Sequence, residues 1–307
     1  MSDIALKAWE RKTLVANLIA QTGIVLTGAI VRLTSSGLGC PTWPECVEGS
    51  IAPTSAQTES WHKYVEFGNR LLTFVLLVVA LVTIVAIVKL NKRRSQAGLA
   101  KRRSLTALAL GALAGIFAQA ILGGITVLTG LHPLTVAAHF MLSIGLITVA
   151  QHLLTKASEP EDLPVTTQVV SPIHVAMKIH VWLALLVVFI GTLVTGSGPH
   201  AGDSAEIVRL GFDPRVISWI HADIVLLFVG LTIGLVVALT ATRAPRQVTR
   251  QAWIVLVICI IQGFVGYTQY FTGLPWALVA MHVLGACLLW IYSVRLYLAR
   301  NTRGARA

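Results

Sequence analysis

The segment QAILGGITVLTGLHPLTVAAH, residues 119–139, recurs with the same spacing as QGFVGYTQYFTGLPWALVAMH, residues 262–282. Each copy is typical of two apolar helices joined by a tight Thr-Gly-Leu turn, with a histidine shortly after the turn. The positions that coincide are Gln119 and Gln262, Gly123 and Gly266, Thr129 and Thr272, Gly130 and Gly273, Leu131 and Leu274, and His139 and His282. An internal repeat of this length indicates one structural unit used twice.

The composition is that of a membrane protein. Of 307 residues, 55% are hydrophobic and only 12% are charged, far from the balance of a soluble domain. Runs of about 20 apolar residues, long enough to cross a bilayer, lie at 13–33, 64–90, 104–128, 134–155, 176–196, 215–241, 252–271 and 277–298. We interpret the first run as a helix rather than a signal peptide, because no small-residue cleavage site follows it. The sequence predicts an all-α polytopic membrane protein with eight transmembrane helices.

The net charge of +11 is distributed by side of the membrane. If alternate connections share a side, 19 of the 24 Lys and Arg residues lie on the side of both chain ends. They fall in the N-terminal lead, the C-terminal tail and the segments 89–103, 156–178 and 243–250. The other side holds Arg32, Lys63, Arg70, Arg209 and Arg215. The positive-inside bias predicts a multi-pass cell-membrane protein with both termini cytoplasmic, whose basic residues contact membrane lipid and not nucleic acid.

One segment divides the chain into two halves. Residues 156–175 (KASEPEDLPVTTQVVSPIHV) are rich in Pro, Ser, Thr and acidic residues and lie midway along the chain. We expect a cytoplasmic linker here, between an N-terminal four-helix half (1–155) and a C-terminal four-helix half (176–307). Because each half crosses the membrane an even number of times, the two bundles have the same orientation.

The four cysteines separate by location. Cys40 and Cys46 share the loop 33–63, which the charge bias places outside, where disulfides persist. We expect a Cys40–Cys46 bridge rather than two free thiols, because a small loop between thiols closes easily. Cys259 and Cys287 lie within apolar helices, where free cysteines act as packing residues.

Three histidines share a depth in the predicted membrane. His139, His221 and His282 lie five to seven residues from the outer ends of their helices, or about 7–11 Å below the outer boundary. The second half thus offers two imidazoles at one level, and the first half offers Asn69 and His139. Two imidazoles from two helices suit a bis-imidazole heme. Zinc is the alternative, but it needs about four ligands, and Asp223 points about 200° round the helix from His221.

Glu66 is the candidate catalytic acid or base. It lies three residues before Asn69, so the two side chains share a face of one helix near its outer end. An ion pair with Arg70, four residues on, is the alternative role. The two roles are compatible, and the sequence leaves both open.

Small and amide residues recur near the same level. The glycines at 123, 124 and 266 either allow a flat macrocycle to approach the backbone or serve helix packing, and we favour packing. Gln119 and Gln262 lie deeper, where amides most often bridge helices, so we expect structural roles.

At these residues the chain resembles the heme A synthase family over essentially its whole length. The features that carry the resemblance are the eight helices in two halves and the segments GLGCPTWPEC, EFGNRLL, AAHF, WIHAD and AMHVLG. The resemblance implies an oxidoreductase that converts the C8 methyl group of heme O to a formyl group, giving heme A for terminal oxidases. It also implies a b-type heme whose iron is held by His221 and His282 in the second half, and a substrate heme O in the first.

The same resemblance implies further roles. His139 corresponds to a histidine that faces the substrate heme iron, Glu66 to an important carboxylate, and Cys40 and Cys46 to an outer disulfide. The implied partners are heme O synthase and the assembly of cytochrome oxidase. The sequence leaves open whether the chain forms a homo-oligomer.

One position departs from the family pattern. Many members have Glu-x-x-His-Arg in the second helix, whereas this chain has Glu66-Phe-Gly-Asn69-Arg70, as actinobacterial members do. His62 shares the helical face and is the alternative ligand, but it lies about 10 Å nearer the surface than Asn69. We favour a five-coordinate substrate heme held by His139 alone.

Two other functions are compatible with a duplicated bundle. A diheme b-type electron-transfer cytochrome would bind heme without changing it, but such a carrier is expected to ligate both hemes fully. A secondary transporter is the third hypothesis, since duplicated bundles are common there. Its usual sign, helices broken by Gly or Pro at matching mid-membrane positions, is not evident here.

Overall fold

The computed structural model confirms the all-helical architecture. It describes residues 4–55, 57, 60–159, 165–200, 202–203 and 208–303. The helices in this part are α1 (Ala8–Leu33), α2 (His62–Gln96), α3 (Arg103–Leu128), α4 (Pro133–Ala157), α5 (Ser171–Ser197), α6 (Pro214–Ala241), α7 (Arg246–Phe271) and α8 (Trp276–Leu298). All eight are long and apolar enough to cross a membrane. The eight helices predicted from hydropathy are therefore present, each within a few residues of the expected span.

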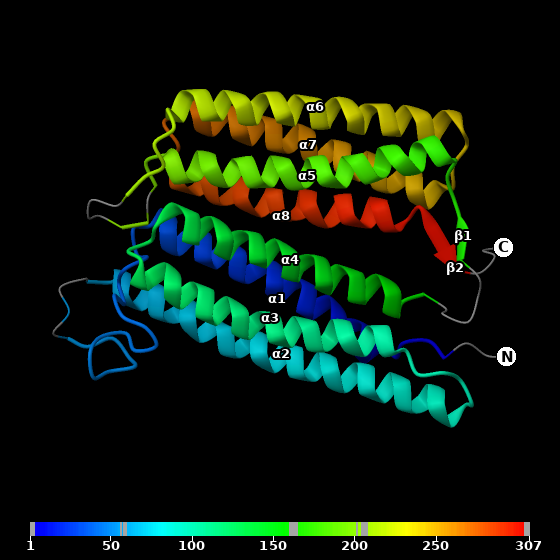
Figure 1. The fold of residues 1–307 in the computed structure, drawn as a ribbon, viewed down its shortest axis with the longest axis horizontal. Coiled ribbons are helices and arrows are strands. Elements are labelled where there is room, and N and C mark those ends of the chain that lie inside the picture. The colour runs from blue at the N-terminus through cyan, green and yellow to red at the C-terminus, as the bar shows by residue number, and fades with distance from the viewer. Residues whose placement is uncertain are drawn as a thin grey trace.

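The helices form two bundles that lie side by side (Figure 1). Helices α1–α4 pack in one bundle and α5–α8 in the other, and consecutive helices are antiparallel neighbours. Both α1 and α5 begin at the end of the molecule where the chain termini lie (Figure 1). The two four-helix halves consequently have the same orientation, as the even number of crossings predicts.

The repeated Thr-Gly-Leu turns have the same backbone in both halves. Gly130 and Leu131 have φ of 61° and 59°, and Gly273 and Leu274 have φ of 78° and 59°. A leucine in the left-handed region is uncommon, so its occurrence at both turns shows that the duplication extends to backbone conformation. In each copy the amide of this leucine donates to a carbonyl five residues earlier, which ends the preceding helix.

The halves meet through α1 and α4 on one side and α5 and α8 on the other. Val25, Ile144 and Ile147 of the first half belong to the same buried cluster as residues of α5–α8. Within the apolar part of this interface, Trp290 Nε1 of α8 donates to Thr148 Oγ1 of α4 at 2.8 Å. A shared apolar core holds the bundles in one arrangement.

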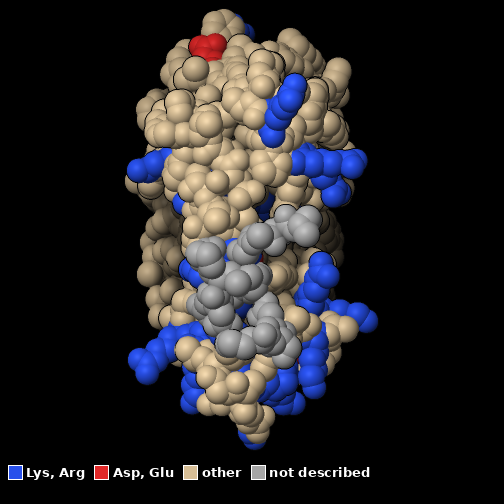
Figure 2. Space-filling view, turned by 90° about the vertical axis from the view of Figure 1, so that its right-hand side faces the viewer, with Lys and Arg blue, Asp and Glu red and all other residues tan. Residues whose placement is uncertain are grey.

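A small sheet closes the end that carries the termini. Strand β1 (Val165–Thr167) pairs antiparallel with β2 (Asn301–Arg303). Helix α4 continues to Ala157 and α5 begins at Ser171, so helices occupy both ends of the segment 156–175 that the sequence marked as a linker. Figure 2 shows Lys and Arg side chains gathered around this end.

Candidate functional site

In each bundle, the first and second helices pack a glycine of one against a polar side chain of the other, and so do the third and fourth helices. A methyl group on Gly123 of α3 would lie 3.1 Å from His139 Cε1 of α4. The corresponding contacts are Gly191 with His221 Cε1 at 3.4 Å, Gly266 with His282 Cε1 at 3.4 Å, and Gly28 with Asn69 Nδ2 at 3.9 Å. The four pairs are α1 with α2, α3 with α4, α5 with α6 and α7 with α8. One arrangement is therefore built four times, and in three of its copies the polar residue is histidine.

The four polar residues share a depth and an unmet hydrogen bond. His139 and His282 lie six residues into their helices, and Asn69 and His221 lie seven, which places all four about 9–11 Å below the helix starts. The Nδ1 atoms of the three imidazoles and Asn69 Oδ1 are buried without a hydrogen-bond partner in the described part of the chain. Most buried polar atoms are paired, so four unpaired atoms at equivalent positions make these side chains candidates for a role beyond helix packing.

The two halves differ in what they offer at this level. The second half has His221 of α6 and His282 of α8 at this level. The first half has His139 of α4 and, on α2, Asn69. Neutral imidazole nitrogens ligate iron, whereas an amide offers a hydrogen bond. The described residues contain no group of three or more His, Cys, Asp or Glu side chains placed to hold a metal ion.

The glycines at 123, 124 and 266 pack against neighbouring side chains, as the favoured packing role predicts. Gly123 and Gly266 face the rings of His139 and His282, so their missing side chains make space for imidazoles. Gly124, by contrast, lies under the ring of Trp43 from the outer loop. Gln119 bridges helices as expected, since its Nε2 donates to His139 O at 3.1 Å and to a serine hydroxyl of α4.

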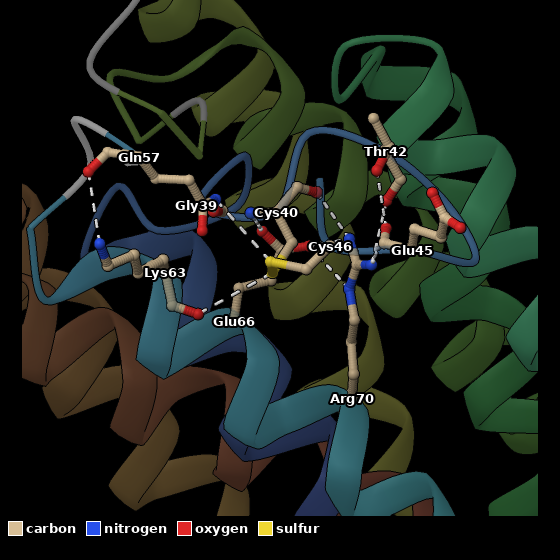
Figure 3. Close-up of polar contacts among 9 residues, drawn as sticks. All are labelled: Gly39, Cys40, Thr42, Glu45, Cys46, Gln57, Lys63, Glu66 and Arg70. Atoms are coloured by element: carbon tan, nitrogen blue, oxygen red, sulfur yellow. Dashed lines mark hydrogen bonds and ion pairs between the residues drawn. A yellow bond between two sulfur atoms is a disulfide. The ribbon is translucent and has the colours of Figure 1, made fainter. Parts of the chain in front are cut away.

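Glu66 is buried near the outer end of α2 and holds the outer loop (Figure 3). Its Oε2 accepts from the Cys40 amide at 2.7 Å. Its Oε1 accepts from Arg70 Nε at 3.1 Å and from Arg70 Nη2 at 2.6 Å. The ion pair that the sequence offered as one of two roles is thus formed. It leaves Oε2 with one free acceptor position, because a carboxylate oxygen can accept two hydrogen bonds.

The loop above Glu66 is closed by a disulfide between Cys40 and Cys46, which confirms the predicted bridge. Arg70 supports the loop from below and donates to the carbonyls of Cys40, Thr42 and Glu45 (Figure 3). The cysteines of α7 and α8 are free and buried, as expected for packing residues. The disulfide loop and the Glu66–Arg70 pair form one hydrogen-bonded unit.

His62 occupies a different position from the deeper polar residues. It is the first residue of α2, its Nδ1 lies 2.9 Å from Ser36 Oγ, and its ring stacks on Trp61 with the centroids 4.1 Å apart. Seven residues separate it from Asn69, which corresponds to about 10 Å along the helix. The structure does not bring His62 to the level of His139.

Sequence reasoning did not single out Gly28 and Gly191. Their signal was present in the similar helix ends GAIVR (28–32) and GTLVT (191–195), which align these two glycines. The sequence of a helix end does not indicate which side chain a glycine faces. The contacts of Gly28 and Gly191 with the neighbouring helices were therefore needed to assign a role to these glycines.

Eight helices long and apolar enough to cross a membrane, arranged in two like-oriented bundles, define a multi-pass membrane protein. Residues 11–294 match the COX15-CtaA family model, described as cytochrome oxidase assembly protein. The match covers nearly the whole chain, and the protein belongs to this family.

Curated relatives in the family are similar over part of their length. The chain is 29% identical over 142 residues to a heme A synthase of Geobacillus kaustophilus (strain HTA426), which covers 46% of this chain and 41% of the relative. It is 35% identical over 141 residues to a heme A synthase of Lysinibacillus sphaericus (strain C3-41), with 46% and 41% covered. A heme A synthase of Geobacillus thermodenitrificans is 28% identical over 144 residues, with 47% and 41% covered. The chain therefore spans less than half the length of the curated relatives it matches.

Proposed function

We propose that this protein is a heme A synthase, which oxidises the C8 methyl group of heme O to the formyl group of heme A. The observation that carries the proposal is the asymmetry of four equivalent positions. The second half has two imidazoles there, and the first has one imidazole, an amide and a carboxylate nearby. Membership of the cytochrome oxidase assembly family supports this assignment, because heme A serves terminal oxidases.

His221 and His282 are the residues that would hold a resident b-type heme in the second half. Their fit rests on three observations: two neutral nitrogen donors on facing helices, a buried unpaired nitrogen on each ring, and a glycine beside each ring. Such a heme supplies one-electron transfer when bound. The two histidines fix its position, and the apolar walls of α5–α8 exclude water from it.

The first half would bind the substrate heme O through His139. Asn69 takes the place of a second imidazole and contributes hydrogen bonding rather than an iron ligand. His62 stays near the outer surface on Ser36 and is not part of this ligand set. The first half would thus offer one imidazole to a heme iron where the second half would offer two, and this difference would suit a substrate in the first half and an electron carrier in the second.

Glu66 is proposed to accept a proton released as the methyl group is oxidised. Arg70 binds Oε1 and the Cys40 amide binds Oε2, so the carboxylate is fixed in place while one acceptor position on Oε2 remains available. Glu66 lies three residues before Asn69, on the face of α2 that turns toward the proposed substrate site. Positioning by Arg70 would make proton transfer directional.

We further propose that both termini are cytoplasmic and that the disulfide loop faces outward. The Lys and Arg residues concentrate at the terminal end of the bundles (Figure 2), and the positive-inside bias assigns that end to the cytoplasm. Heme O synthase is the proposed source of substrate, and oxidase assembly the destination of the product. A fluorescent protein fused after Ala307 should fluoresce, and alkaline phosphatase inserted after His200 should be active; the reverse pattern would invert the orientation.

Co-expression with a source of heme O, followed by chromatography of extracted hemes, tests the activity. Heme A should accumulate only when the protein is present. Persistence of heme O alongside folded, heme-loaded protein would instead support a diheme electron-transfer cytochrome. A purified protein without a Soret band would support a transporter and exclude both heme functions.

Single substitutions distinguish the roles proposed for the two halves. His282→Ala should remove the tightly bound low-spin heme b, whereas His139→Ala should retain it and lose heme A formation. His174→Ala, at the opposite end of α5, is the matched control and should change neither. If both ligand variants keep an unchanged low-spin spectrum, the assignment of hemes to halves is incorrect.

A further inference from the structure

Arg32 is a cationic side chain that contacts no carboxylate among the residues that the structure describes. It lies one residue before the end of α1 and is partly buried. Its Nε donates to His200 O at 2.8 Å and its Nη2 donates to Thr195 O at 3.1 Å. A guanidinium has five N–H groups, so three of them have no partner among the described residues. These N–H groups are not among the buried unpaired atoms, so they remain accessible to a ligand.

Two arginines that do contact carboxylates show which kind of partner Arg32 lacks among the described residues. Arg70 pairs with Glu66, and Arg93 pairs with the buried Glu10. Each of those guanidiniums places two nitrogens on carboxylate oxygens. Arg32 has only backbone carbonyls as partners within the described part of the chain. Its free N–H groups suit the two oxygens of a carboxylate, the geometry that arginine binds best.

The position of Arg32 relates it to both proposed heme sites. It follows Gly28 by four residues, so it lies one turn outward on the same face of α1 as the contact with Asn69. Its acceptor Thr195 follows Gly191 by four residues and lies one turn outward from the contact with His221. One turn of helix is about 5.4 Å. Arg32 thus reaches from the first bundle to the second, just outside the level of the imidazoles.

The duplication makes this placement unusual. Arg32 in GAIVR and Thr195 in GTLVT are counterparts in the two halves, so the arginine of one half donates to the backbone of its own counterpart in the other. Only one guanidinium is present for two equivalent positions. It lies where α1 and the outer end of α5 come together, between the two glycine contacts.

We propose that Arg32 binds a heme propionate, the carboxylate that projects from the edge of the macrocycle toward the outer face. The inference rests on the proposed function, since it requires heme at the level of the imidazoles. Two hemes carry the same carboxylate chemistry: the resident heme of the second half and the substrate heme of the first. Arg32 acts on the reaction by positioning a heme and does not touch the methyl group that is oxidised.

The test compares Arg32→Gln with Arg209→Gln in the full-length, heme-loaded protein. Arg209 is exposed on the same outer side and serves as the matched control. Three quantities are measured: the rate of heme b transfer to apomyoglobin, the midpoint potential of heme b, and KM for heme O. Loss of an arginine–carboxylate contact is expected to weaken heme binding by about tenfold or more.

The pattern of change identifies the heme. Faster heme b release with a lower midpoint potential assigns the propionate to the resident heme, because an uncompensated carboxylate favours the oxidised iron. A higher KM with unchanged release and potential assigns it to the substrate. If Arg32→Gln matches Arg209→Gln in all three measurements, the inference is overturned and the arginine only joins the loops.

A second measurement covers the case in which Arg32→Gln fails to accumulate. Arg32→Lys keeps the charge but cannot make the two-pronged contact with a carboxylate. Hemin is added to the heme-depleted variant and to the heme-depleted original protein, and the increase in thermal midpoint is compared between the two. A smaller gain supports propionate binding, and an equal gain overturns it. If the protein without substitutions forms no heme A but is still stabilised by hemin, the proposed function is rejected and the assignment of a resident heme is retained.

Discussion

The strongest test of the outer loop is the substitution Gly39→Ala. Gly39 lies against the first turn of α2, and an added Cβ would be 2.7 Å from Lys63 Cα and 2.8 Å from the carbonyl carbon and oxygen of His62. Nine in ten Cβ contacts are longer than about 3.4 Å. The obstacle is helix backbone, which cannot turn aside, so the loop has to rise by roughly 0.7 Å at this point.

The displacement of the loop would lengthen the hydrogen bond between Cys40, the next residue, and Glu66. The Cys40 amide donates to Glu66 Oε2 at 2.7 Å, and a rise of the loop takes this distance to about 3.4 Å, beyond the usual range. A hydrogen bond to a charged group contributes about 1.5–3 kcal/mol. Because about 1.4 kcal/mol is a factor of ten, the loop should open roughly 10- to 100-fold more often in Gly39→Ala.

The rate of reduction of the Cys40–Cys46 bridge measures this opening. Folded protein is treated with a thiol reductant, quenched with an alkylating reagent and analysed by mass spectrometry, and the variant should be reduced roughly 10- to 100-fold faster. Gly68→Ala is the control, since an added Cβ there meets no atom within 4 Å. Heme A formation should fall in Gly39→Ala as Glu66 loses a fixed position. Equal reduction rates in all three proteins would refute the docking of the loop on Glu66.

Three further predictions concern the bundles and the first-half site. Trp290→Phe removes the hydrogen bond to Thr148 between the halves and should cost about 1 kcal/mol, seen as a thermal midpoint lower by about 2–4 °C; an unchanged midpoint would show that this hydrogen bond does not stabilise the arrangement of the bundles. Asn69→His should give the first half a low-spin bis-imidazole spectrum and slow heme A formation, and a variant that stays fully active would contradict the need for an open position. His62→Ala should lower heme A formation far less than His139→Ala, and an equal loss would return His62 to the ligand set.

Much of the fold was predictable because its determinants are local. A bilayer requires about 20 consecutive apolar residues for each crossing, so hydropathy located the helices without knowledge of their packing. The disulfide was predictable for a similar reason, since Cys40 and Cys46 are only six positions apart on one loop. The shared depth of His139, His221 and His282 followed from counting residues from helix ends.

The contacts that organise the site were not predictable in the same way. The bond from Cys40 to Glu66 depends on the path of a loop whose Gly39 fits against α2. The bond from Arg32 to His200 joins residues 168 positions apart and depends on how the bundles are set against each other. The pairing of β1 with β2 has the same origin, because strands of three residues are too short to carry a periodic signal.

The four glycine contacts explain how one scaffold can serve two different tasks. In each half, two helices present a polar side chain at one depth, and a glycine of the preceding helix makes space for it. Changing the side chain alone, from His221 to its counterpart Asn69, alters the ligand set without altering the helices that carry it. The two halves also differ in charge at one equivalent position, where the first half has Arg32 and the second half has the uncharged Thr195. Because the scaffold is common to both halves, the chemistry proposed for each would depend on these substitutions and, in the first half, on the outer loop that docks on Glu66.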